Sequence, residues 1–330
     1  MRAMLCRQLG SPDVLQMEEI PSPVPKAGEV LLEVKACGVS FPDVLMVQGK
    51  YQIKPELPFS PGIEVAGIIK AVGDQVSGFK PGDAVFGRAM NGFAEELVTT
   101  PDFLWHLPKG VDFNVAAGFS MNYGTSWYGL KYRAQLKPGE TLLVLGASGG
   151  VGLAAVELGK LMGARVIACA SSEEKLAICR REGADDTINY ETGTEDLREA
   201  VKRLTGLTNN GGVDVVYDPV GDRFADPAVR SLAWGGRYLV VGFAAGQIPK
   251  VALNLPLLKG GAIVGVWWGG LMKADPDMAR RLTQELVELI AAGRIKPHVS
   301  AVYPLARAAD ALKDLMSRKA TGKIVVNMEA

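Results

Sequence analysis

A short run of small residues near the middle of the chain has the composition of a phosphate-binding turn. Its positions are Ala147, Ser148, Gly149, Gly150, Val151 and Gly152. Glycines let a backbone approach a pyrophosphate closely, and a helix that begins there offers N–H groups and the positive end of its dipole. Ala147 stands where such a turn usually has its first glycine, which is acceptable if that residue needs no positive φ. The run predicts a dinucleotide-binding turn, with a purely structural turn as the alternative.

The residues around this turn supply the strand and helix that it requires. Residues 141–145 are continuously apolar, as in a strand buried on both faces of a parallel sheet, and apolar residues then recur at helical spacing up to Met162. Further along, strand-like and helix-like segments alternate. We expect strands at 165–170, 187–190, 213–217, 237–241 and 262–266, with helices at 173–182 and 196–204. This alternation predicts a doubly wound parallel sheet with strand order 3-2-1-4-5-6.

The flanking parts of the chain have a different character. Residues 1–122 are rich in glycine, proline and short strand-like runs, which favours a compact, barrel-like β domain. After the sixth strand we expect a long amphipathic helix and then a shorter helix and a last strand. The expected segments are 30–36, 64–72, 84–87, 94–98 and 323–326 as strands, and 277–292 and 308–316 as helices.

Composition excludes several classes of function. The 330 residues have a formal net charge of zero, which argues against a nucleic-acid or acidic-membrane partner. No apolar run reaches the ~20 residues that span a bilayer, and the first residues lack the apolar core of a signal peptide, so we expect a cytoplasmic protein. The four cysteines form no CxxC pair, and His106 and His298 are the only histidines, so a histidine-rich metal site within one chain is excluded.

Several motifs occur in an order that resembles a known family. They are Gly62-Ile63-Glu64-Val65-Ala66-Gly67, then Val72-Gly73, then Gly82-Asp83-Ala84-Val85, followed by the central turn. Over essentially its whole length the chain resembles the medium-chain dehydrogenase/reductases, and among them the zinc-independent, zeta-crystallin-like quinone oxidoreductases. The resemblance implies an α/β protein with a Rossmann nucleotide domain at 123–268. It implies a GroES-like, mainly β catalytic domain formed by 1–122 and 269–330.

The chain departs from the zinc-dependent branch of that family at its metal ligands. Ser40 and Phe41 stand where that branch has cysteine and histidine, and Ile63 replaces the histidine of Gly-His-Glu. These side chains ligate zinc poorly, so no metal is expected. Glu64 is retained, and we interpret it as a structural carboxylate bonded to nearby backbone.

The same resemblance indicates catalytic candidates. Quinone reductases of the family often have asparagine and, three residues later, aspartate near the nicotinamide; here the pair is Ser40 and Asp43. The segment around Tyr51 also resembles enoyl-thioester reductases, in which a tyrosine at this place is the proposed proton donor. Ser40, Asp43 and Tyr51 are the predicted catalytic residues, and a tyrosine that only lines the pocket mouth is the alternative for Tyr51.

The end of the expected second strand bears on the choice between NADH and NADPH. No carboxylate stands at its tip to hold a ribose 2′-hydroxyl, because Glu173 and Glu174 belong to the first turn of the next helix, capped by Ser171 or Ser172. The resemblance assigns Ser171, Lys175 and Tyr190 to a 2′-phosphate, so the predicted cofactor is NADPH; an ordinary solvated lysine is the alternative for Lys175.

Other residues are expected to hold the cofactor. The predicted set also contains Asn122 and Thr125, on the nicotinamide side, and Gly242, Phe243, Trp267 and Lys323. Phe243 and the pair Trp267-Trp268 form an apolar wall that suits a flat substrate, although the tryptophans have the alternative of ordinary core or interface packing.

The predicted reaction is hydride transfer from NADPH to a quinone or related conjugated carbonyl compound. An NADPH-dependent 2-enoyl-thioester reductase is the first alternative, and a non-catalytic nucleotide-binding structural protein is the second. We also expect a homodimer, because the sixth strand is apolar and lies at the sheet edge, unless the helix from Asp277 covers that edge.

Overall fold

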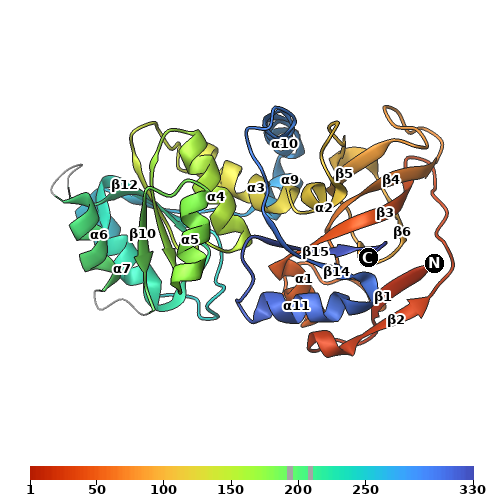
Figure 1. Ribbon diagram of the computed structural model, residues 1–330, viewed down its shortest axis with the longest axis horizontal. Coiled ribbons are helices and arrows are strands. Elements are labelled where there is room, and N and C mark those ends of the chain that lie inside the picture. Colours follow the sequence, from red (N-terminus) through yellow and green to blue (C-terminus); the bar gives the residue numbers. More distant parts are fainter. Residues whose placement is uncertain (192–195, 207–210) are drawn as a thin grey trace. The chain divides into compact units, whose positions relative to one another are not determined.

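A computed structural model describes the chain except for residues 192–195 and 207–210. The chain divides into two compact units: unit 1 is Met1–Met121 with Ile290–Ala330, and unit 2 is Asn122–Leu289 (Figure 1). The first division lies within a residue of the expected one. The second lies after Leu289 rather than after residue 268, because the helix α10 (Pro276–Ala291) is bonded to unit 2. Its Glu285 accepts hydrogen bonds from Trp127 Nε1 at 2.6 Å and Lys131 Nζ at 2.8 Å.

Unit 2 is built on a six-stranded parallel sheet with the order β10-β9-β8-β11-β12-β13. The predicted order 3-2-1-4-5-6 is therefore confirmed. The strands are β8 (Thr141–Val144), β9 (Arg165–Ala170), β10 (Asp186–Asn189), β11 (Val213–Asp218), β12 (Leu232–Val240) and β13 (Ala262–Gly265).

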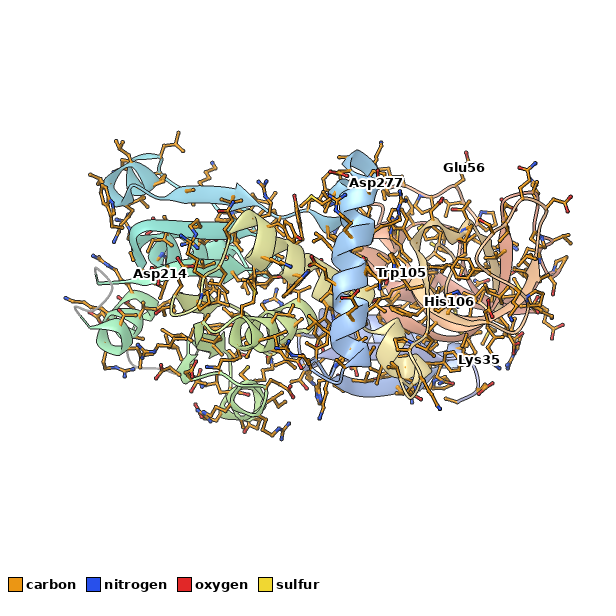
Figure 2. The ribbon with its side chains drawn as sticks, turned by 90° about the horizontal axis from the view of Figure 1, so that it is seen from above. Lys35, Glu56, Trp105, His106, Asp214 and Asp277 are labelled. Carbon is orange, nitrogen blue, oxygen red and sulfur yellow. The ribbon has the colours of Figure 1, made fainter. Side chains whose placement is uncertain are left out.

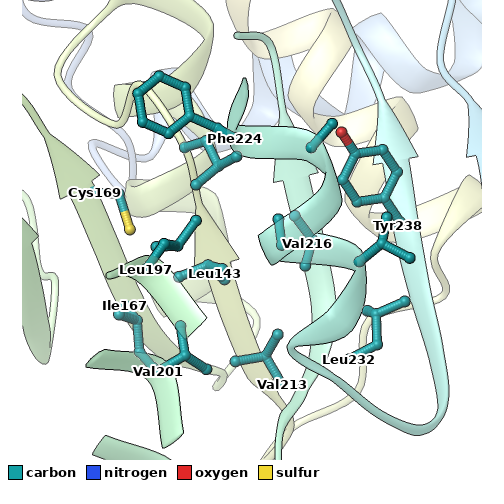
Figure 3. Close-up of a cluster of buried hydrophobic side chains, with 14 of the residues drawn as sticks. Leu143, Ile167, Cys169, Leu197, Val201, Val213, Val216, Phe224, Leu232 and Tyr238 are labelled. Atoms are coloured by element: carbon teal, nitrogen blue, oxygen red, sulfur yellow. The ribbon is translucent and has the colours of Figure 1, made fainter. Parts of the chain in front are cut away.

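Helices cover both faces of this sheet. The helices that follow residue 119 in this part of the chain are α3 (Ser120–Trp127), continued by a π-helical turn at Tyr128–Arg133, α4 (Gly150–Leu161), α5 (Glu173–Arg181), α6 (Leu197–Thr205), α7 (Ala225–Arg230), α8 (Asn254–Lys259) and α9 (Trp268–Ala274). On one face, α6 and α7 enclose a buried cluster that includes Leu143, Ile167, Val201 and Val216 (Figure 3). On the other face, Gly159 of α4 packs against Leu142 and Val166. Burial on both faces explains why these strands are apolar without alternation.

Unit 1 is a mainly β unit. Its larger sheet has seven strands in the order β14-β15-β3-β4-β5-β7, with β6 paired to β3, and β1 and β2 form a separate antiparallel pair. The strands are β1 (Arg2–Cys6), β2 (Leu15–Glu19), β3 (Val30–Val39), β4 (Glu64–Val72), β5 (Ala84–Arg88), β6 (Glu96–Thr99), β7 (Leu104–His106), β14 (Val299–Pro304) and β15 (Lys323–Asn327). Figure 2 marks Trp105 and His106 on β7.

Three helices accompany the sheets of unit 1 within the described part of the chain: α1 (Phe41–Val47), α2 (Phe113–Ala117) and α11 (Ala308–Met316). The predicted helix 308–316 is confirmed at both ends. Short 3-10 turns lie at Pro12–Val14, Pro101–Phe103, Asp222–Phe224 and Leu305–Arg307. Across the described residues, no helix is both long and apolar enough to cross a membrane.

Candidate active site

The glycine turn of unit 2 joins β8 to α4 in the order that the sequence predicted. Gly146, which the sequence analysis did not include, has the positive φ of 56° that the tight turn requires. Ala147 has no positive φ; it is fully buried, and its N–H donates to the Cys169 carbonyl at 2.9 Å. The alanine is therefore compatible with the turn, because the preceding glycine supplies the special backbone conformation.

The turn is packed so closely that side chains are excluded from parts of it. A Cβ atom on Gly152 would overlap the Gly146 carbonyl oxygen, and one on Gly150 would lie 2.5 Å from Nδ2 of Asn122. Gly149 is the N-cap of α4 and has more room. A bare backbone turn at the N-terminus of a twelve-residue helix fits a pyrophosphate. Asn122 packs directly against it.

Residues of α3 connect the turn to the next strand of the sheet. Asn122 and Thr125 lie one turn apart on α3. Between them, Tyr123 donates a hydrogen bond to Glu157 of α4. Ser126 Oγ donates to the Val151 carbonyl at 2.8 Å and lies 2.9 Å from the Tyr217 hydroxyl. These bonds fix α3 against the start of α4, so Asn122 and Thr125 are held on a rigid element.

The three residues predicted to bind a 2′-phosphate meet at the ends of β9 and β10. Lys175 Nζ donates to Ser171 Oγ at 3.1 Å, and the Tyr190 N–H donates to the Ala170 carbonyl at 3.2 Å. Ser172 is the N-cap of α5, so Glu173 and Glu174 are first-turn residues as predicted. The Lys175 cation and the Ser171 hydroxyl therefore lie where a dinucleotide fold holds the adenosine ribose, and this pair fits a phosphate, whereas the Tyr190 ring packs against Phe224.

The predicted aromatic wall separates into parts with different surroundings. Gly242 and Phe243 line a cavity of about 190 Å³ in unit 2, together with Asp218, Tyr238 and Ile263. Trp267 is 55% exposed, whereas Trp268 is buried. A Cβ atom on Gly124 would meet the Trp268 indole, so Trp268 packs against α3. Trp268 is therefore a core residue of unit 2, and Trp267 is the exposed member of the pair.

A buried charge cluster in unit 1 contains the predicted residue Ser40. Lys323 Nζ donates to Ser40 Oγ at 2.9 Å and to Glu64 Oε2 at 2.7 Å, and Lys323 is only 3% exposed. The other oxygen of Glu64 accepts from Ser120 Oγ at 3.0 Å and from the Met121 N–H at 2.8 Å. The interpretation of Glu64 as a structural carboxylate bonded to backbone is confirmed. Lys323, which was predicted to bind the cofactor, bonds through its ammonium to Ser40 and Glu64 in this structure.

Asp43 holds the loop and helix that carry Ser40. Its Oδ2 accepts from the Ser40 N–H at 2.8 Å and its Oδ1 from the Gly62 N–H at 3.0 Å. Burial raises the pKa of Asp43 to about 7, opposed by these two backbone hydrogen bonds and by the Lys323 charge. Asp43 thus orients Ser40 through the backbone at the start of α1, where Ser40 is the N-cap.

Tyr51 is partly buried and lies near a residue that the sequence analysis missed. This residue is Arg88, the last residue of β5. Burial lowers the pKa of Arg88, and the nearby Tyr51 acts in the opposite direction. An arginine at the end of the apolar run 84–87 was the available signal.

The positions of the zinc ligands of related enzymes carry other contacts here. Ser40 Oγ accepts from Lys323, Ile63 is buried, and both oxygens of Glu64 already have donors. Among the residues that the structure describes, no three His, Cys, Asp or Glu side chains are grouped to hold a metal ion. This donor set does not fit zinc.

The sheet order and the glycine turn at the start of α4 together define a dinucleotide-binding fold. The zinc-binding dehydrogenase family matches residues 150–291, and the alcohol dehydrogenase GroES-like domain matches residues 26–109. The chain belongs to the quinone oxidoreductase family of the medium-chain dehydrogenase/reductase superfamily.

Relatives match the chain over almost its entire length. Quinone oxidoreductase-like protein 2 of Bos taurus is 40% identical, over 99% of this chain and 93% of its own. The quinone oxidoreductase of Escherichia coli, solved in complex with NADPH, is 31% identical with a TM-score of 0.89, over 99% of this chain and 100% of its own. The quinone oxidoreductase of Thermus thermophilus, also solved with NADPH, is 32% identical with a TM-score of 0.85, over 99% of this chain and 100% of its own.

Proposed function

We propose that this protein is a zinc-independent, NADPH-dependent reductase of quinones and related conjugated carbonyl compounds. The observation that carries the proposal is the contact between Lys175 and Ser171 just after β9, which is the strand next to β8 and its intact dinucleotide turn. Relatives that were solved with NADPH support the same cofactor. NADPH supplies a hydride from its nicotinamide to an electron-poor acceptor.

Unit 2 binds and orients the cofactor in this proposal. The backbone from Ala147 to Gly152 receives the pyrophosphate at the N-terminus of α4, where N–H groups and the helix dipole favour an anion. Lys175 and Ser171 bind the 2′-phosphate, with Tyr190 beside them. Asn122 and Thr125 contact the nicotinamide side, and Gly242, Phe243 and Trp267 complete the apolar surroundings.

Unit 1 supplies hydrogen bonds and a proton. Reduction leaves an enolate or a hydroquinone anion, which has to be stabilised and protonated. The Lys323 ammonium can only donate hydrogen bonds, so Ser40 Oγ is the acceptor in the bond between them. The Ser40 hydroxyl proton is therefore directed away from Lys323, and we assign it to the developing oxyanion. Tyr51 is the proposed proton donor, and Lys323 is a positioning residue rather than a direct cofactor ligand.

The first test is NADPH consumption with 9,10-phenanthrenequinone or crotonyl-CoA, in wild type and in Tyr51→Phe. Loss of a general acid usually lowers turnover ~10²–10⁴-fold. A large loss on both acceptors supports Tyr51 as the donor, and a large loss on the thioester alone favours an enoyl-thioester reductase. Zinc required in stoichiometric amounts for activity would contradict zinc independence. NADPH binding without consumption of either acceptor would favour the structural alternative.

We also propose a homodimer formed through unit 2. The strand β13 is at the edge of the sheet, and its Ile263 is 39% exposed. Three more apolar side chains are exposed in α8 and in the residue before it, with exposed fractions of 81% for Leu253, 76% for Leu257 and 68% for Leu258. An uncovered apolar edge favours pairing, and two copies of one strand can pair antiparallel about a two-fold axis. The exposure of Ile263 argues against an edge covered by α10.

The assembly is tested by sedimentation velocity of wild type, Ile263→Lys and Val24→Lys. Val24 is 81% exposed in unit 1 and serves as the matched control for an added charge. We expect a dimer for wild type and for Val24→Lys, and a monomer for Ile263→Lys. A wild type that sediments as a monomer at micromolar concentration would refute the proposal.

A further inference from the structure

Arg88 projects from the same face of the unit 1 sheet as Glu64, which belongs to the buried charge cluster. It lies directly opposite Glu64 in the antiparallel pairing of β4 and β5. Residues directly opposite each other in such a pair project from the same face. The nearby charges are already engaged, because both oxygens of Glu64 accept hydrogen bonds from Lys323, Ser120 and Met121. Arg88 therefore adds a second cation to a face whose carboxylate is already used.

The guanidinium of Arg88 has no counter-charge among the described residues. Its Nε is buried and has no hydrogen-bond partner, and no carboxylate in the described chain forms an ion pair with it. The guanidinium stays protonated, because arginine does not lose its proton in proteins. Tyr51 is an ionisable group of unit 1 that, when deprotonated, would raise the pKa of Arg88. Unit 1 thus keeps a partly buried arginine without a charged partner among the described residues, within electrostatic range of the proposed proton donor.

A charge that is partly removed from water without a partner is unfavourable, and groups perturbed by desolvation cluster at functional sites. The planar guanidinium binds carboxylate, sulfonate or phosphate groups with two parallel hydrogen bonds. We propose that Arg88 binds an anionic group of the acceptor, so that the protein prefers conjugated carbonyl compounds that carry a carboxylate or a similar anion. This inference rests on the proposed reductase function and specifies its substrate class.

The test compares two quinones that differ by one anion. These are 1,2-naphthoquinone and 1,2-naphthoquinone-4-sulfonate, assayed with NADPH and the full chain as wild type, Arg88→Gln, Arg88→Lys and Arg307→Gln. Arg307 is an exposed arginine of unit 1 that pairs with Asp310, so its variant is the matched control. We expect wild type to prefer the sulfonate.

In Arg88→Gln the kcat/KM for the sulfonate should fall roughly ten- to a hundredfold, the range for loss of a charged hydrogen-bond partner. The value for the neutral quinone should stay nearly unchanged in this variant. Arg88→Lys should retain part of the preference, because it keeps the charge and loses the paired geometry. Arg307→Gln should behave as wild type.

Equal losses on both quinones in Arg88→Gln would overturn the proposal and indicate a structural role or an effect on Tyr51. No loss on either would also overturn it. If wild type reduces neither quinone, the proposed function fails, and calorimetric titration with the sulfonate then decides the inference by itself. Binding at least tenfold weaker in Arg88→Gln than in wild type supports an anion site. Equal binding, or none by wild type, refutes it.

Discussion

Lys175→Ala should convert a protein that selects NADPH into one that barely distinguishes NADPH from NADH. The lysine lies at the start of α5, and its ammonium is held 3.1 Å from Ser171 Oγ. The Tyr190 backbone is bonded to the residue before Ser171, so the phenol comes from the neighbouring strand end. These contacts place the cation at the carboxyl ends of two adjacent parallel strands, where the adenosine ribose of a dinucleotide binds.

The magnitude follows from the chemistry of one lost contact. A hydrogen bond to a charged group contributes ~1.5–3 kcal/mol, and ~1.4 kcal/mol is tenfold in affinity. Because the 2′-phosphate would keep Ser171 and Tyr190, the loss should stay within that range. The Kd for NADPH should therefore rise roughly ten- to a hundredfold, and the Kd for NADH should change little. Fluorescence titration of each cofactor, or calorimetry, measures both values.

Arg180→Ala is the matched control for this experiment. Arg180 is a cation on the same helix, but its guanidinium bonds to Glu173 at 3.1 Å and to Thr187 at 2.8 Å. Its removal changes the helix charge equally and should leave the affinities for NADPH and NADH nearly as in wild type. If Lys175→Ala weakens both cofactors equally, or if Arg180→Ala reproduces its effect, the assignment of Lys175 to the 2′-phosphate is refuted.

Three further predictions concern the turn and the buried cluster. Gly152→Ala should lower the melting temperature and abolish stabilisation by NADPH, because its methyl group would overlap a backbone oxygen, whereas Gly149→Ala, with 3.4 Å available within the protein, should keep the melting temperature of the unliganded protein; equal melting temperatures of the two unliganded variants would contradict this. Lys323→Met should lower the free energy of unfolding, measured in urea, by ~3–5 kcal/mol, because it leaves the Glu64 carboxylate buried without its cation. The double variant Lys323→Met/Glu64→Gln should regain part of this free energy, because it removes the unpaired charge. The pKa of Asp43 is higher in the folded protein than in the unfolded chain, so the free energy of unfolding of wild type, relative to that of Asp43→Asn, should fall as pH rises from 3.8 to about 7. A difference between the two proteins that does not change with pH would contradict this prediction.

Much of unit 2 could be predicted from the sequence because its signals are local. Strands buried on both faces are apolar runs, and glycines mark the turn, so the six strands and their order followed from pattern. The ends of segments were less accurate: the fifth strand begins at Leu232 and not at residue 237. The small edge strands of unit 1 were missed, since β14 alternates between partly buried and exposed residues and ends in a proline.

The buried cluster could not be predicted because its members are far apart in the chain. Ser40, Glu64 and Lys323 come from different elements, and only the sheet of unit 1 brings them together. No local pattern in the sequence shows which carboxylate a lysine meets, so the bond between Lys323 and Glu64 could not be predicted. Arg88 was missed for the same reason: its significance is that it lacks a partner, and this depends on the packing around it.

The central claim is hydride transfer from NADPH to a conjugated carbonyl acceptor. It is tested most directly by single-turnover oxidation of protein-bound NADPH, with hydrogen or deuterium at the transferred C4 position, by 9,10-phenanthrenequinone. We predict rapid oxidation that is slower with deuterium, because the C4–H bond breaks in the measured step. Bound NADPH that is not oxidised by this quinone, or that is oxidised at the same rate with either isotope, would contradict the claim.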